Sequence, residues 1–224
     1  LSVKEIADEI EELDSDDAAD ILSELSERRK EEVISEISDD NLADNLKELL
    51  SYNEDSAGGL MAKELIKANE NWSVSKCLDE IKKQGENVTR VHSVYVVDDN
   101  KKLIGRLSLK DLITSSSKSI IKDIYIPKVD SVNVLEKGED IAKIMSKYDL
   151  EAIPVVDDKK HLVGRITIDD IVDFIIDEAE EDYLLAAGIQ GDVEADDSII
   201  ELTKARLPWL FLGLVGGLGS VFIL

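Results

Sequence analysis

Acidic side chains at helical spacing near residue 175 could bind a divalent cation. Asp170 and Asp173 are three residues apart, and Glu178 and Asp182 are four apart. On a helix, side chains at these spacings share a face. Mg²⁺ takes oxygen ligands in octahedral geometry and keeps several of its waters. Carboxylates held close together repel one another, and a divalent ion between them removes that repulsion. These residues therefore indicate a cation site.

A second interpretation fits the same residues. Any one of these carboxylates could lie on a solvated helix face. Asp169 and Asp170 could also favour the N-terminus of a helix, where negative charge is stabilised. Spacing alone leaves both interpretations open.

The charge balance points to cations and away from nucleic acids. The chain has 224 residues, enough for one or two compact domains, with 50 acidic and 26 basic residues and a net charge of -24. Such a surface repels phosphate backbones, so we expect no nucleic-acid partner. Disorder fits poorly, because 43% of the residues are hydrophobic and recur periodically.

No arrangement of residues predicts catalysis. The sequence contains no P-loop, no Ser-His-Asp arrangement and no zinc-ligand spacing. Cys77 falls on the apolar side of a helical pattern, so we expect a small core residue. His92 and His161 have no partners at metal-ligand spacing, and we assign them no role. We therefore expect a protein that is not an enzyme.

The first 52 residues or so predict a small helical bundle. Apolar residues recur at spacings of three and four throughout this segment. Breaks at Asp14-Ser15-Asp16 and Ser38-Asp39-Asp40 are natural N-cap sites.

The last residues, 207–224, are uncharged and apolar and indicate the start of a membrane helix. A buried core helix is the alternative. Lys204 and Arg206 precede this segment, so the positive-inside tendency predicts that the upstream residues are cytoplasmic. Because the sequence begins at Leu1 and stops inside the apolar run, we expect the natural chain to extend at both ends.

An internal repeat occupies the middle of the chain. SVYVVDDNKKLIGRLSLKDLI, from Ser93 to Ile113, aligns without gaps on AIPVVDDKKHLVGRITIDDIV, from Ala152 to Val172. Each copy predicts a buried strand, a turn at Asp-Asp, a second strand and a helix. Helices are also expected ahead of each copy, at 73–83 and 138–148, and each of these follows a short strand.

This repeat resembles the paired CBS domain. The resemblance rests on the V-V-D-D turn, the glycine of L-x-G-R and the Ser/Thr-x-x-Asp that follows, in both copies. Ahead of the first copy, Asp55-Ser56-Ala57-Gly58-Gly59-Leu60-Met61 is similar to the segment joining the two cytosolic domains of MgtE-type magnesium channels. Behind the second copy, an acidic helix leads into Leu207-Pro208-Trp209-Leu210, which looks like the entry to the first membrane helix.

The resemblance to the MgtE family implies an α+β multidomain chain. Its expected parts are a partial helical N domain at 1–55, CBS domains at 56–121 and 122–183, a connecting (plug) helix at 184–206 and the start of a transmembrane helix at 207–224. It also implies a homodimer in the cell membrane, multi-pass in full, with this region cytoplasmic and attached to a pore domain that this chain lacks.

The resemblance also implies Mg²⁺ ligands, between the CBS pair and the plug helix and between the CBS pair and the N domain. Carried over position by position, the ligands are Asp16, Asp20, Glu139, Asp149, Asp170, Asp173, Glu178, Glu181 and Asp182. The family's acidic residue two positions before Glu139 is Lys137 here.

CBS pairs commonly bind adenine nucleotides, so ATP is a second expected ligand. Ser108, Lys110 and Asp111 would contact its phosphate and ribose. The aromatic residue that usually stacks on the base is replaced by Leu150. Alternatively, Ser108 and Asp111 only cap the helix that follows them.

The function expected from this resemblance is control of Mg²⁺ flux, with bound Mg²⁺ holding the domains together and the pore shut. A nucleotide-sensing CBS module and a membrane-tethered adaptor that binds protein are the alternatives.

Overall fold

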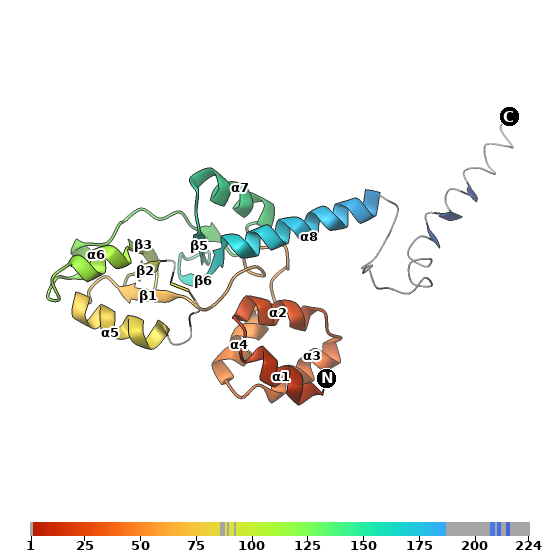
Figure 1. The fold of residues 1–224 in the computed structure, drawn as a ribbon, viewed down its shortest axis with the longest axis horizontal. Helices are drawn as coiled ribbons and strands as arrows, with labels where there is room; N and C mark the ends of the chain where they lie inside the picture. Colours follow the sequence, from red (N-terminus) through yellow and green to blue (C-terminus); the bar gives the residue numbers. More distant parts are fainter. Residues whose placement is uncertain are drawn as a thin grey trace. The chain divides into compact units, whose positions relative to one another are not determined.

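The computed structural model describes residues 2–85, 88, 90, 91, 93–186, 207, 208, 210, 211, 214 and 215. The chain divides into two compact units, Leu1–Val172 and Asp173–Leu224. The first unit contains the N-terminal helices and both copies of the repeat (Figure 1). The second unit begins inside helix α8, and the two units are described separately.

The N-terminal segment is the predicted bundle of short helices. They are α1 (Val3–Ile10), α2 (Ser15–Ser23), α3 (Glu27–Glu36) and α4 (Asp40–Leu49). Each helix buries an apolar face. Ile10, Leu22, Val33 and Leu46, one from each helix, are almost completely buried.

The two predicted caps in this bundle have different outcomes. The carboxylate of Asp39 accepts hydrogen bonds from the backbone N–H groups of Asn41 and Leu42, which confirms the cap of α4. Asp14 is the N-cap residue of α2, as predicted, but its side chain makes no cap hydrogen bond there. Its carboxylate instead pairs with Arg165, which is far away in the sequence.

Both repeat copies form the predicted strands and helices. The first contains β1 (Ile66–Asn69), α5 (Val74–Gln84), β2 (Val94–Val97), β3 (Leu103–Leu107), α6 (Leu109–Thr114) and the short 3₁₀ helix η2 (Ile121–Asp123). The second contains β4 (Val132–Asn133), α7 (Gly138–Tyr148), β5 (Ala152–Val156), β6 (Leu162–Thr167) and α8 (Ile168–Ala186). In each three-stranded sheet, the first strand is parallel to the middle strand and the third is antiparallel to it.

The V-V-D-D motif explains the turn between the second and third strands of each copy. The first aspartate of the pair, Asp98 or Asp157, accepts hydrogen bonds from the backbone N–H groups two and four residues further on. Lys101 and Lys160 occupy the same turn position and have φ angles of 62° and 68°. The same local bonds therefore close both hairpins.

The glycine of L-x-G-R allows another segment to pair with the third strand. A Cβ on Gly164 would come within 2.9 Å of the Ala62 carbonyl, and one on Gly105 would strike the Ile126 carbonyl. The arginine after each glycine forms an isolated antiparallel bridge with that same segment. The segment leading into each copy thus pairs with the other copy, which ties the two copies together.

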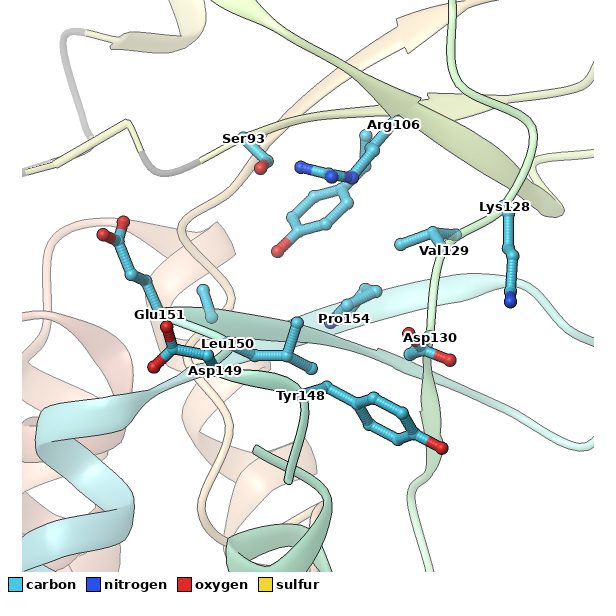
Figure 2. A pocket seen from close by; sticks show the side chains of 12 residues that line it. Ser93, Arg106, Lys128, Val129, Asp130, Tyr148, Asp149, Leu150, Glu151 and Pro154 are labelled. Carbon is cyan, nitrogen blue, oxygen red and sulfur yellow. The ribbon is translucent and has the colours of Figure 1, made fainter. Parts of the chain in front are cut away.

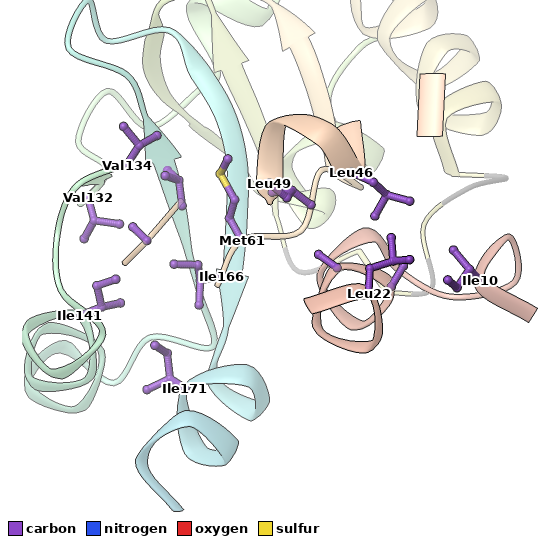
Figure 3. Packing of buried hydrophobic residues seen from close by; sticks show 14 of the residues in the cluster. Ile10, Leu22, Leu46, Leu49, Met61, Val132, Val134, Ile141, Ile166 and Ile171 are labelled. Atoms are coloured by element: carbon purple, nitrogen blue, oxygen red, sulfur yellow. The ribbon is translucent and has the colours of Figure 1, made fainter. Parts of the chain in front are cut away.

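Buried apolar side chains form two clusters. One joins the N-terminal helices to the second repeat copy through Met61, and Figure 3 shows Leu22 and Leu46 on one side of it and Val132 and Ile166 on the other. The other fills the first copy and includes Cys77, as predicted. The helical segment therefore shares its core with the second copy.

The C-terminal predictions fall largely outside the described residues. The connecting helix expected at 184–206 is described only to Ala186, where α8 ends. Most of the apolar segment at 207–224 also lies outside the described residues. No helix in the described part of the chain is long and apolar enough to cross a bilayer.

Candidate functional site

A pair of carboxylates marks the junction between the N-terminal helices and the second repeat copy. Asp16 lies in the first turn of α2 and is partly buried. Burial is the main cause that raises the pKa of Asp16 from 3.8 to about 7, and the negative charge of Asp170 is the second. The structure thus brings together two of the predicted metal ligands, Asp16 and Asp170.

Asp170 is held at the start of α8. Its carboxylate accepts hydrogen bonds from the backbone N–H of Thr167 at 2.8 Å and from the Thr167 hydroxyl at 2.6 Å. Asp170 therefore stabilises the N-terminus of α8, as the second interpretation predicted. The same carboxylate also raises the pKa of Asp16. Within the described residues, neither carboxylate forms an ion pair with a lysine or arginine.

The remaining predicted ligands have other local surroundings. Glu139 pairs with Lys143 at 3.6 Å, Asp20 is exposed, and Asp149 ends α7 in the left-handed conformation with φ 54°. Further predicted ligands, Asp173, Glu178 and Asp182, lie on α8 in the C-terminal unit, and the side chain of Glu181 is outside the described set. Among described residues, no group of three or more Asp, Glu, His or Cys side chains is arranged to hold a metal.

A pocket of about 460 Å³ lies between the two repeat copies (Figure 2). Ser93, Tyr95 and Arg106 line it from the first copy, and residues 128–130 line it from the segment between the copies. The second copy contributes residues 148–152 and Pro154. The volume is in the range of sites for small molecules. Asp149, predicted as a metal ligand, is therefore also part of this pocket wall.

The predicted nucleotide contacts Ser108, Lys110 and Asp111 are not among the residues that line this pocket. Ser108 stands at the N-cap of α6 but makes no side-chain cap bond, so the capping interpretation is wrong for Ser108. Leu150, in the usual place of the stacking aromatic, does line the pocket. The nucleotide roles of Ser108, Lys110 and Asp111 stay predictions.

Buried hydrogen bonds fix the N-terminal helices to the second repeat copy. The Ser15 hydroxyl donates to Glu64 Oε2 at 2.8 Å and accepts from the Lys63 backbone N–H at 2.8 Å. Arg165, only 6% exposed, donates through Nε to the Glu64 carbonyl at 2.6 Å and pairs with Asp14 at 3.4 Å. We call these five residues the Ser15 junction.

Replacing Ser15 with alanine is expected to destabilise the chain. The side chain is fully buried, so its loss leaves the Lys63 N–H without this acceptor and removes a donor to the Glu64 carboxylate. Unpaired buried polar groups cost about 1–3 kcal/mol. Urea unfolding measures the change. Ser35→Ala, an exposed matched control, should stay within about 0.5 kcal/mol of wild type. Equal stabilities for both variants would contradict the assigned role.

Comparisons with known proteins agree with this architecture. A sequence model of the MgtE intracellular N domain matches residues 1–55, and that of the CBS domain matches residues 57–118 and 121–177. The magnesium transporter MgtE of Enterococcus faecalis is 36% identical over 182 residues, which cover 81% of this chain and 40% of the transporter. The chain thus spans less than half the length of this relative.

Two solved structures are similar over most of the chain. The soluble part of a magnesium transporter has a TM-score of 0.74 and 36% identity, covering 80% of this chain and 70% of that one. The cytosolic domain of the Mg²⁺ channel MgtE in complex with ATP has a TM-score of 0.69 and 31% identity. The match covers 78% of this chain and 76% of that one.

Together, the fold and the matches define a tandem CBS-domain protein with a helical domain ahead of the pair. The chain belongs to the MgtE family of magnesium transporters, and it is similar to the family's cytosolic region.

Sequence reasoning missed the contacts of the Ser15 junction and the place of the Tyr95 and Arg106 side chains in the pocket wall. The sequence did single out the two arginines, since Arg106 and Arg165 occupy the same position of the repeat. Their different surroundings depend on contacts between segments that are distant in the sequence.

Proposed function

We propose that this chain is the Mg²⁺-sensing regulatory region of a magnesium transporter. It would lie on the cytoplasmic side of the cell membrane, joined to a pore domain in another part of the protein. Mg²⁺ bound by the N domain, the CBS pair and the acidic helix would favour the closed pore, and low Mg²⁺ would release it. The family membership and the net charge of -24 support this assignment.

The observation that carries the proposal is the Asp16–Asp170 pair. Asp16 ionises against both burial and the neighbouring negative charge, as its raised pKa indicates. A divalent cation near these carboxylates would remove that cost. Because each carboxylate belongs to a different domain, Mg²⁺ would stabilise the junction between the N domain and the second CBS copy.

The affinity should be weak and should depend on pH. Mg²⁺ gives up its waters reluctantly, so a site with few protein ligands gains little over water. A carboxylate must be ionised to bind the ion, so Mg²⁺ and a proton compete for Asp16. We expect Mg²⁺ affinity to fall as the pH is lowered through about 7.

Isothermal titration calorimetry with Mg²⁺ tests the proposal. Asp16→Asn should weaken Mg²⁺ binding, whereas Asp8→Asn, which removes an exposed carboxylate of α1, should leave it unchanged. Equal affinities for both variants would remove Asp16 from the sensor. Undetectable Mg²⁺ binding by the wild type would overturn the proposed function.

We also propose that the chain acts as a homodimer. Large apolar side chains are exposed on both CBS copies, with Ile113 72% and Leu135 69% exposed, which favours burial against a second chain. Light scattering at tens of micromolar in Mg²⁺ should give twice the mass of one chain. A single-chain mass would contradict the dimer.

A second candidate function is nucleotide binding. It is favoured by the pocket between the CBS copies and by the similarity to an MgtE cytosolic domain solved with ATP. Under this proposal, ATP occupies the pocket and adjusts the response to Mg²⁺. A rise in melting temperature with ATP would support the proposal, and an unchanged rise in Asp111→Ala would show that Asp111 does not contact ATP.

A further inference from the structure

Arg165 connects the second CBS copy to the start of helix α2. Its backbone pairs in both directions with Ala62, in the segment between α4 and β1, at 2.8 and 3.0 Å. Its side chain donates through Nε to the Glu64 carbonyl at 2.6 Å and lies 3.4 Å from the Asp14 carboxylate. Because Asp14 is the N-cap residue of α2, this buried cation joins the N domain to the second CBS copy.

The CBS fold itself does not require a buried arginine at this position. Arg106 occupies the same position of the first copy and forms the equivalent backbone bridge, with Ile126. Arg106 is exposed, whereas Arg165 is only 6% exposed. Burying a charge is costly unless the charge is paired and hydrogen-bonded. The N domain supplies the opposite charge for Arg165, through Asp14.

Glu64 holds the same end of α2. Its carboxylate accepts hydrogen bonds from the Ser15 backbone N–H at 3.1 Å and from the Ser15 hydroxyl at 2.8 Å. Ser15 is the first residue of α2, so its N–H has no acceptor within the helix. A residue from outside the N domain therefore caps α2, and this cap is lost whenever the N domain moves away.

A repulsive pair of charges acts on the same turn of α2. Burial and then the negative charge of Asp170 raise the pKa of Asp16, so the two carboxylates repel. Arg165 and Thr167 share a face of β6, because successive side chains on a strand alternate. The Thr167 hydroxyl in turn donates to Asp170. Residues 14–16 thus meet residues 165–170 through one attractive pair of charges and one repulsive pair.

We propose that Arg165 is a positioning residue for the proposed Mg²⁺ site. By pairing with Asp14, it holds the first turn of α2 against the second CBS copy and keeps Asp16 near Asp170 before the ion binds. The inference rests on the proposed function and adds the contact that opposes the repulsion. If the ion binds only the closed junction, its apparent affinity falls with the fraction of chains in which the junction is closed. The Asp14–Arg165 contact therefore helps to determine the Mg²⁺ concentration at which the sensor responds.

Two substitutions at the start of α2 should have opposite effects without Mg²⁺. Asp14→Asn removes the attraction to Arg165, so the junction should open more often. Asp16→Asn removes the repulsion from Asp170, so the junction should open less often. Each variant lowers the net negative charge by one, so a general effect of net charge would shift both in the same direction. Asp8→Asn, on the exposed side of α1, measures that general effect.

Residue-resolved hydrogen exchange at pH 8, in buffer containing a chelator, measures the opening. The Lys63 backbone N–H is the reporter, because it donates to the Ser15 hydroxyl across the junction. Asp14→Asn should speed its exchange about tenfold, as expected for the loss of a hydrogen bond between charged groups. Asp16→Asn should slow it, and Asp8→Asn should stay within about twofold of wild type. Saturating Mg²⁺ should slow exchange in the wild type and in Asp14→Asn, and should slow it less in Asp16→Asn.

A purely structural role for Arg165 gives a different result. If Asp14 acts through Arg165, adding Asp14→Asn to Arg165→Gln should not speed exchange beyond Arg165→Gln alone. If Arg165 only stabilises the second CBS copy, Arg165→Gln lowers the melting temperature, and Asp14→Asn has the same effect on exchange with or without it. That second result would overturn the inference.

The remaining outcomes separate the inference from the proposed function. If Mg²⁺ slows exchange in the wild type but Asp14→Asn and Asp16→Asn shift it in the same direction, the inference is wrong and the proposed function stands. This comparison does not depend on whether Arg165→Gln folds. If Mg²⁺ does not slow exchange in the wild type, both are wrong.

Discussion

Asp16→Asn is expected to stabilise the chain at pH 8 without Mg²⁺. The pKa of Asp16 is raised from 3.8 to about 7, mainly by burial and then by the charge of Asp170. Each pKa unit corresponds to about 1.4 kcal/mol, so ionising Asp16 in the folded chain costs at most about 4 kcal/mol.

The sign follows from linkage between protonation and folding. The folded state holds the Asp16 proton more tightly than the unfolded state, because its pKa is higher when folded. The wild type therefore loses stability as the pH rises from about 4 to about 7, and the asparagine variant lacks this loss. The stability difference between the two proteins should be near zero at pH 4 and largest at pH 8.

Urea unfolding at several pH values, with and without Mg²⁺, measures this difference. Mg²⁺ at pH 8 should stabilise the wild type more than Asp16→Asn, because the ion offsets the charge that the variant lacks. Asp8→Asn controls for the loss of one negative charge from the surface. A difference between wild type and Asp16→Asn that is the same at pH 4 and pH 8 would contradict the cost assigned to Asp16.

Asp173→Asn is expected to affect the acidic helix in two opposite ways. Under the proposed function, Mg²⁺ draws α8 toward the CBS pair by neutralising carboxylates that include Asp149, Asp173 and Glu178. Removing one charge relieves repulsion when the ion is absent and deletes a ligand when it is present. The helix should be more protected without Mg²⁺ and should respond less to Mg²⁺.

Cleavage by a glutamyl endopeptidase, followed against Mg²⁺ concentration, measures that protection, since Glu178 and Glu180 lie within α8. The Mg²⁺ midpoint should rise roughly tenfold in Asp173→Asn, because affinity at such sites follows the number of charged ligands. Asp123→Asn, in the first CBS copy, is a control away from the proposed ligands. Identical midpoints for wild type and Asp173→Asn would remove Asp173 from the sensor.

The repeat made most of the fold predictable, because its signals are local. Local hydrogen bonds of Asp98 and Asp157 close each hairpin, and the glycines at 105 and 164 leave room for the segment that pairs with the third strand. The helix over 138–148 was predicted with the bounds that the structure has. Periodic apolar residues likewise predicted the N-terminal bundle.

The site was less predictable, because its properties come from contacts across the sequence. Asp14 has the residue type of an N-cap, yet it pairs with Arg165 at a separation of 151 residues. Asp16 is one of 50 acidic residues, and only its burial and its position near Asp170 distinguish it. Arg106 and Arg165 are equivalent in the repeat, and only tertiary packing separates their roles.

Small-angle scattering of the chain during a Mg²⁺ titration tests the central claim most directly. The radius of gyration should fall through a saturable transition as Mg²⁺ joins the carboxylates of the N domain, the CBS pair and the acidic helix. NaCl at matched ionic strength should give a smaller change that does not saturate, because it only screens the charges. A radius that is insensitive to Mg²⁺, or that NaCl lowers equally, would contradict the account of this chain as a Mg²⁺ sensor.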